Sequence, residues 1–160
     1  MEEKLQPRLL TRESVVQAFP LVCNVLPQVT LKQWVGFARP HIMVGWQTMP
    51  RGLMTVQNDD GYILGLFSFE VRGDLTETRI LWVNNIIVPN IPGRDVVWAT
   101  LVGAIDGLAK TNRCHAVRAG LADTLIRAGS DRRWVTTSLE EAGYSFDGVQ
   151  GFRRLEAERR

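Results

Sequence analysis

The spacing of apolar residues predicts helices near the start of the chain. Residues 8–10 are short enough to form a first strand. After Thr11, which suits an N-cap, apolar residues recur at helical spacings at Val15, Phe19, Val22 and Leu26. Pro20 lies inside this pattern, so we expect the helix to be kinked or split there. A second helix is predicted over 31–38, ending near Arg39 because the residue before a proline disfavours helical angles.

From Gly52 the pattern becomes that of β-strands. Two extended runs, 53–57 and 62–71, are joined by 58–61, which ends in the Asp-Gly pair typical of hairpins. Alternation in the second run places Ile63, Phe67, Phe69 and Val71 on one face, and Tyr62, Leu64, Leu66, Ser68 and Glu70 on the other. After a turn at 72–74, the most apolar run of the chain, 79–88, predicts a central strand.

Helices and strands alternate in the second half of the chain. Asp95 suits the N-cap of a helix whose apolar stripe ends around Asn112, and 116–120 predicts a short strand. Ser130 opens another helix, with Gly143 in its C-cap position. A last extended piece over 149–155 precedes a charged tail from about residue 156. This order of elements predicts an α/β (α+β) fold.

Length and composition favour a single domain spanning 1–160. The chain has 160 residues, of which 45% are hydrophobic and 22% charged, as in folded globular proteins. Charged residues interrupt the most apolar regions, so no run reaches the roughly 18 residues that a membrane helix needs. The acidic start, Met-Glu-Glu-Lys, does not match a signal peptide. We therefore expect a cytoplasmic protein without a membrane partner.

Charge and cysteine content narrow the partners further. The net charge is only +2, which argues against a dedicated nucleic-acid binder. Cys23 and Cys114 lie far apart and belong to no CxxC pair, so neither a metal site nor a disulfide framework is indicated. Arginines gather toward the C-terminus at 132–133, 153–154 and 159–160. They are interpreted as a solvated face or as a weak site for RNA or acidic substrates.

Two stretches resemble a known family. The run Asn-Ile-Ile-Val-Pro at 85–89, the loop 90–94 and the helix from Asp95 are similar to the central strand, pyrophosphate loop and following helix of the GNAT superfamily of acyl-CoA-dependent N-acyltransferases. Residues 138–144, Ser-Leu-Glu-Glu-Ala-Gly-Tyr, resemble that family's closing helix. With the order of elements, the resemblance covers nearly the whole chain. It implies a mixed, mostly antiparallel central sheet flanked by about four helices.

The resemblance implies acetyl-CoA as acyl donor and no metal. Backbone N–H groups at the start of the helix would converge on the pyrophosphate. The cofactor-binding residues so implied are Ile87, Val88, Gly93, Arg94, Asp95, Val96 and Val97, together with Asp123, where the family often presents an Asn to the pantetheine arm. Pro92, Asp95 and Val97 depart from the family's Arg or Gln, Gly, and Gly or Ala. Arg94 is a candidate phosphate contact, and a plain strand-to-helix turn is the alternative.

Acyl transfer to an amine also calls for proton transfer. The family often uses a Glu near the central strands and a Tyr on the last helix, where this chain has Leu139. The catalytic candidates are therefore Glu70 as base, Asn85 as a group that orients water or substrate, and the hydroxyl of Ser138. His41 and Trp46 belong to an aromatic-rich stretch that either walls an acceptor pocket or caps the core.

Taken together, the resemblance implies an N-acyltransferase that moves an acetyl group from acetyl-CoA to a primary amine by direct transfer. The acceptor would be a small molecule or a peptide. A homodimer formed through edge strands would be unsurprising in this family. The alternative is a catalytically inactive GNAT-like module that senses a ligand or binds a protein.

Overall fold

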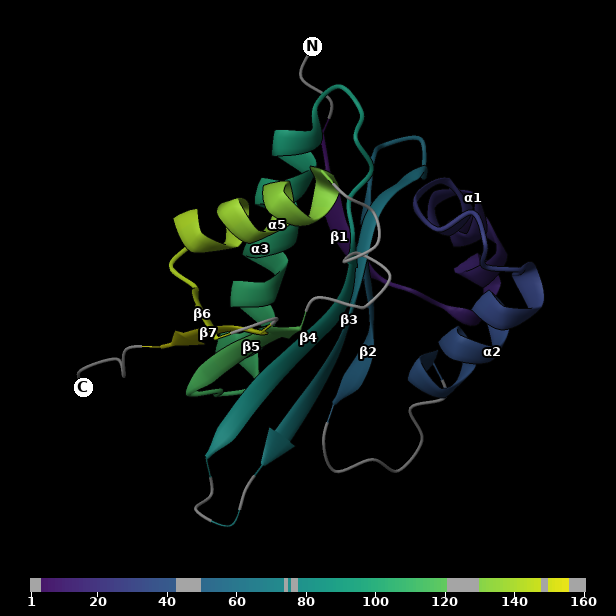
Figure 1. The fold of residues 1–160 in the computed structure, drawn as a ribbon. Helices are drawn as coiled ribbons and strands as arrows, with labels where there is room; N and C mark the ends of the chain where they lie inside the picture. Colours follow the sequence, from purple (N-terminus) through teal and green to yellow (C-terminus); the bar gives the residue numbers. More distant parts are fainter. Residues whose placement is uncertain are drawn as a thin grey trace.

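A seven-stranded sheet organises the chain (Figure 1). The computed structural model describes residues 4–42, 50–73, 75, 78–120, 130–147 and 150–155. The strands are β1 (Gln6–Leu9), β2 (Arg51–Gln57), β3 (Ile63–Gly73), β4 (Arg79–Ile87), β5 (Ala116–Gly120), β6 (Ser145–Asp147) and β7 (Gln150–Arg154). Their order across the sheet is β1-β2-β3-β4-β5-β7-β6. Only the β4–β5 pair is parallel, so the predicted mixed, mostly antiparallel sheet is confirmed, with β4 at its centre.

Helices cover both faces of this sheet (Figure 1). A 3-10 turn, η1 (Arg12–Ser14), leads into α1 (Val15–Val25) and α2 (Leu31–Ile42), which pack on one face. On the other face lie α3 (Arg94–Thr111) and α5 (Ser130–Glu141). Each face therefore has its own apolar core, and the sheet separates the two. Within the part of the chain that the structure describes, no helix has the length and apolar composition needed to cross a bilayer.

The β2–β3 hairpin forms where the sequence predicts it. Asn58 Oδ1 accepts hydrogen bonds from the backbone N–H groups of Asp60 and Tyr62, at 3.1 and 2.9 Å. A bulge follows, because Gln57 pairs with Ile63 whereas Val56 pairs with Gly65. One extra residue reverses the facing of side chains. The predicted assignment of side chains to the two faces is therefore wrong at the start of β3. Ile63 packs against the α1/α2 core, and Leu64 packs against the α3/α5 core.

Two helix boundaries differ from the prediction. The helix α2 continues through Pro40 to Ile42, because a proline in the last turn removes only one backbone hydrogen bond. The helix α3 begins at Arg94, and its N-cap is Gly93 rather than Asp95. Gly93 has φ 82°, a left-handed conformation that glycine adopts without strain. The chain therefore turns into α3 before Asp95, which lies in the first helical turn.

Candidate functional site

The site begins at an irregularity in β4. This strand pairs with β5 only as far as Val83, opposite Ala119. On its other edge a bulge follows, since Asn84 pairs with Ser68 whereas Ile87 pairs with Leu66. Asn85, inside the bulge, has φ 54°, which Asn tolerates better than most residues. Asn85 lies beyond the last β4–β5 pair and lines both of the pockets described below.

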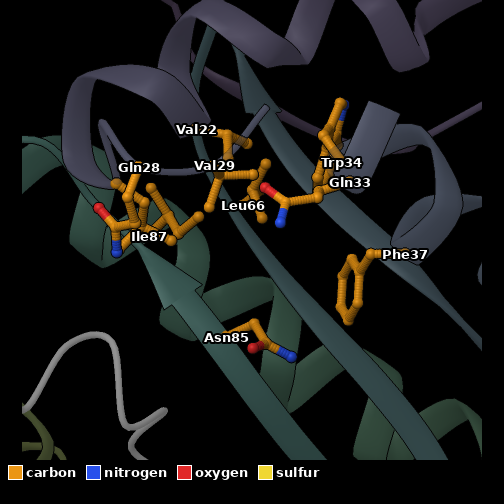
Figure 2. A pocket seen from close by; sticks show the side chains of 10 residues that line it. Val22, Gln28, Val29, Gln33, Trp34, Phe37, Leu66, Asn85 and Ile87 are labelled. Atoms are coloured by element: carbon orange, nitrogen blue, oxygen red, sulfur yellow. The ribbon is translucent and has the colours of Figure 1, made fainter. Parts of the chain in front are cut away.

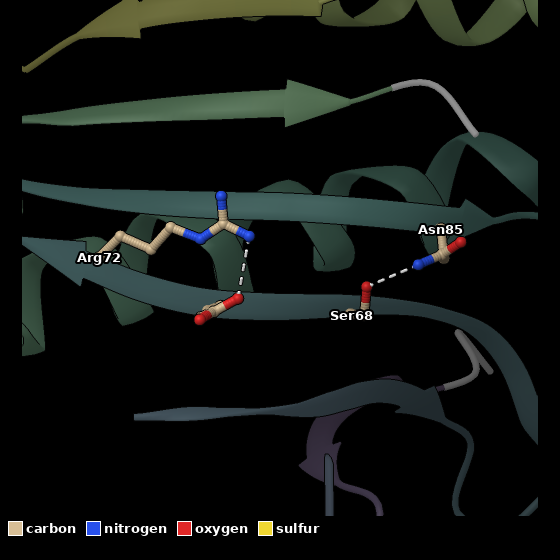
Figure 3. Close-up of polar contacts among 4 residues, drawn as sticks. Ser68, Arg72 and Asn85 are labelled. Atoms are coloured by element: carbon tan, nitrogen blue, oxygen red, sulfur yellow. Dashed lines mark hydrogen bonds and ion pairs between the residues drawn. The ribbon is translucent and has the colours of Figure 1, made fainter. Parts of the chain in front are cut away.

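The side chain of Asn85 is held by a hydrogen bond to Ser68, which is itself bonded to the backbone. Its Nδ2 donates to Ser68 Oγ at 2.9 Å (Figure 3). The Ser68 hydroxyl in turn donates to the carbonyl of Asn84 at 3.0 Å. Ser68 is only 4% exposed, which protects both bonds from water. Asn85 Oδ1 makes no hydrogen bond within the described ranges. It is therefore a fixed acceptor for a ligand N–H group.

An apolar pocket of about 430 Å³ lies between the sheet and the two N-terminal helices. Figure 2 shows its lining, which is mostly aliphatic and aromatic with three amides: Val22, Leu26, Gln28, Val29, Gln33, Trp34, Phe37, Leu66, Asn85 and Ile87. Trp34 is held by a hydrogen bond from its indole N–H to the carbonyl of Val15, at 2.7 Å. Size and composition match a small-molecule site.

A polar pocket of about 310 Å³ adjoins it on the strand side of α2. It is lined by His41, Ser68, Phe69, Glu70, Arg72, Asn84 and Asn85. Glu70 and Arg72 form an ion pair of 3.1 Å, with both side chains about half exposed (Figure 3). Asn85 belongs to both pockets, so a ligand could place an apolar part in one and a polar part in the other.

His41 enters the polar pocket in a defined orientation. Its Nδ1 lies 3.0 Å from the carbonyl oxygen of Phe37, and its ring packs against the Phe37 ring at 4.7 Å between centres. Because a carbonyl only accepts, Nδ1 carries the hydrogen in this contact. In the neutral imidazole, the lone pair then lies on Nε2.

The loop 89–93 and the first turn of α3 form a compact corner after β4. The Arg94 N–H donates to the carbonyl of Ile91 at 3.1 Å, and the Val96 and Val97 N–H groups donate to the carbonyl of Gly93 at 3.0 and 3.3 Å. The backbone N–H of Asp95 has no partner among the described residues. This N–H lies in the first turn of α3, at the positive end of the helix dipole, and can donate to a ligand.

Arg94 ties this corner to two other elements. Its Nη2 donates to the carbonyl of Val88 at 3.1 Å, and its guanidinium lies 3.7 Å from the centre of the Trp134 ring on α5. Trp134 in turn packs edge-on against Trp98 of α3. The guanidinium is therefore held at the N-terminus of the helix.

These features fit the pyrophosphate of coenzyme A. A helix N-terminus and a fixed guanidinium both favour phosphate oxygens, although the Asp95 carboxylate in the first turn opposes them. Val97, which replaces a small family residue, is 2% exposed and packs inward. A Cβ on Gly65 would lie 3.0 Å from its Cγ1, so Gly65 makes room for it. Because the Val97 side chain packs into the core, it does not cover the outer side of this turn, where the backbone stays accessible.

The structure places most of the predicted site residues in two groups, one at the pockets and one at the start of α3. His41, Glu70 and Asn85 line the polar pocket, and Ile87 lines the apolar one. Val88, Gly93, Arg94, Asp95, Val96 and Val97 form the corner at the start of α3. Ser138 lies on α5, on the face of the sheet that is opposite α1 and α2, and it lines neither pocket. Trp46 and Asp123 lie outside the described residues. Leu139, at the family's Tyr position, is fully buried.

The sequence analysis missed most residues that line the pockets, including several polar ones. Gln33, Ser68 and Arg72 line them but were not candidates. Strand alternation puts Ser68 and Arg72 on the face of Glu70, so this signal was present. Gln33 depends on how α2 docks on the sheet, which the local pattern does not contain. No cluster of three or more His, Cys, Asp or Glu side chains in the described ranges is arranged to hold a metal ion.

The fold is that of the GNAT acyl-CoA N-acyltransferases. An aminoglycoside N-acetyltransferase in complex with CoA is 13% identical, and the match covers 100% of this chain and 97% of that one with a TM-score of 0.63. A ribosomal-protein-alanine N-acetyltransferase from Brucella melitensis biovar Abortus 2308 is 14% identical over 91% of this chain and 95% of that one, with a TM-score of 0.66. Spermidine N-acetyltransferase from Vibrio cholerae, in complex with CoA and spermine, is 16% identical over 94% and 92%, with a TM-score of 0.60. Neither a family model nor a curated protein sequence matches the chain.

Proposed function

We propose that this protein is an N-acyltransferase that moves the acetyl group of acetyl-CoA directly to a primary amine. One observation carries the proposal: two pockets meet at Asn85, where β4 leaves β5, and the N-terminus of α3 follows directly along the chain. The solved structures that share this fold include N-acetyltransferases in complex with CoA. That fold-level analogy supports the donor, while the pockets support an acceptor site.

Acetyl-CoA supplies an activated thioester: the amine nitrogen forms a bond to the acetyl carbon, the C–S bond breaks, the nitrogen loses a proton and the CoA thiolate takes one. On the donor side, the Arg94 guanidinium and the backbone N–H of Asp95 bind the pyrophosphate. On the acceptor side, Asn85 Oδ1 accepts a hydrogen bond from the amine N–H. This contact orients the nitrogen lone pair, and positioning of this kind lowers the barrier.

His41 is the favoured proton acceptor. An ammonium must lose a proton before it attacks, so the site needs a base with an accessible lone pair. His41 Nε2 meets this need, since Nδ1 is committed to Phe37. Glu70, the base expected from the sequence, is engaged in an ion pair with Arg72, whereas no charged side chain is bound to His41 among the described residues. With leucine at position 139, we assign protonation of the thiolate to water, because a thiol with a pKa of about 8.5 leaves readily.

The proposal is tested by following CoA thiol release with a panel of primary amines. We expect turnover with at least one amine, a loss of about 10²-fold or more in kcat for His41→Gln, and a lower kcat for Asn85→Ala. Gln17→Ala, an exposed position on α1, is the control and should match the parent protein. If the folded parent releases no thiol with any amine, the transferase proposal fails, and binding without turnover would instead identify a ligand-sensing module.

A further inference from the structure

Arginine and aromatic side chains alternate across the sheet next to the polar pocket. The row runs from Arg72 of β3 over Trp82 of β4 to Arg118 of β5 and Phe152 of β7. Arg72 Cζ lies 4.5 Å from the centre of the Trp82 ring. Arg118 Cζ lies 5.3 Å from the Trp82 ring and 5.2 Å from the Phe152 ring. The strand register places Trp82, Arg118 and Phe152 directly side by side. We call these four residues the arginine–aromatic row.

Stacking makes these arginines suited to acidic ligands. An aromatic ring holds the flat face of a guanidinium, while hydrogen bonds form in its plane, where two N–H groups match the two oxygens of a carboxylate or phosphate. An ordered side chain also loses less entropy when it binds. Trp82, Arg118 and Phe152 are half-buried, so the row is fixed yet reachable.

The surrounding charges favour an anion as well. Arg51 of β2 is the register partner of Glu70, and its buried Nε has no hydrogen-bond partner among the described residues. Among the described residues, Arg51, Arg72 and Arg118 share this part of the sheet with one acid, Glu70. A polyamine or other polycation would meet like charge here.

Arg72 connects the row to the proposed acceptor site, because it lines the polar pocket together with Asn85. Trp82 and Asn85 are three residues apart on β4, roughly 10 Å along a strand. An acidic group on the row and an amine at Asn85 could thus belong to one small molecule. Pockets of about 430 and 310 Å³ also match a small molecule rather than a macromolecule.

We infer that the acceptor is a small primary amine that also carries a carboxylate or a phosphate, which Arg72 and Arg118 bind while the amine lies at Asn85. This inference rests on the proposed transferase function and names its substrate class. It assigns Arg72 and Arg118 to specificity rather than to the chemical step.

The test compares amines that differ only in the acidic group. 6-Aminohexanoate is paired with hexylamine for the carboxylate, and 6-aminohexyl phosphate with 6-aminohexanol for the phosphate, with spermine as the polycation. We expect kcat/KM to be at least tenfold higher for the acidic member of one pair, and that pair identifies the anion. In Arg72→Gln and Arg118→Gln, KM for that acceptor should rise at least tenfold with kcat nearly unchanged. Arg8→Gln, on the exposed β1 strand, is the matched control.

The outcomes separate the two proposals. If the uncharged amines or spermine are acetylated as well as the acidic ones, the inference is overturned and the transferase function stands. If no amine is acetylated, the transferase function fails. In that case calorimetric titration with 6-aminohexanoate and 6-aminohexyl phosphate decides: binding that is lost in Arg72→Gln but kept in Arg8→Gln supports the anion site, and absence of binding overturns it.

Discussion

Replacing Arg94 with methionine tests whether the corner between β4, α3 and α5 is held as the structure shows. The substitution removes a hydrogen bond from a charged donor to Val88, worth about 1.5–3 kcal/mol, and a cation–π contact worth about 0.5–1 kcal/mol. Methionine keeps an apolar contact with Trp134 and recovers part of this. We therefore expect the free energy of unfolding to fall by about 2 kcal/mol.

Urea unfolding followed by tryptophan fluorescence measures this loss. With a slope of about 2 kcal/mol per molar urea, the midpoint should fall by about 1 M. Arg133→Met is the matched control, because Arg133 is exposed and immediately precedes Trp134 on α5. Its free energy of unfolding should stay within about 0.5 kcal/mol of that of the parent. Equal midpoints for Arg94→Met and the control would contradict the inference that Arg94 stabilises the packing of β4, α3 and α5.

Further substitutions and titrations address packing and ionisation. Gly65→Ala should lower the free energy of unfolding by about 1–3 kcal/mol, because the new Cβ would lie 3.0 Å from the nearest atom; Gly103→Ala, with nothing within 4 Å on α3, should raise it in the same urea assay. Burial raises the pKa of the Cys114 thiol, so a thiol reagent near pH 8 should modify Cys23 first, and equal rates would contradict the burial. Burial is also the main cause that raises the pKa of Tyr144 to about 12. The free energy of unfolding should therefore fall as pH rises from about 10 toward 12, and Tyr144→Phe should abolish that fall.

The sequence predicts the order of elements well because most of them carry their own periodicity. The central position of β4 follows from apolar residues on both of its faces, and β5 is predicted with its observed bounds, Ala116–Gly120. The prediction is less complete at the end of the chain, because β6 and β7 form an antiparallel pair where one extended piece was expected. A three-residue strand such as β6 shows too little alternation to be recognised.

The proposed donor side of the site can be located in the sequence because it is one continuous stretch, from the end of β4 to the first turn of α3. The acceptor side depends on distant contacts. Asn85 and Ser68 meet only because the bulge in β4 sets their register. Trp82 and Phe152 come to flank Arg118 through two further strand pairings. Single-strand patterns hold no information about such pairings, so the arginine–aromatic row emerges only from the fold.

Calorimetric titration with acetyl-CoA tests the central claim, that the corner at the start of α3 binds the acyl donor, most directly. We expect a micromolar Kd, a binding free energy of roughly −8 kcal/mol. Asp95→Asn should tighten binding, because it removes a negative charge beside the phosphates, and Arg94→Met should weaken it. Absence of binding up to millimolar acetyl-CoA in the folded protein would contradict the claim.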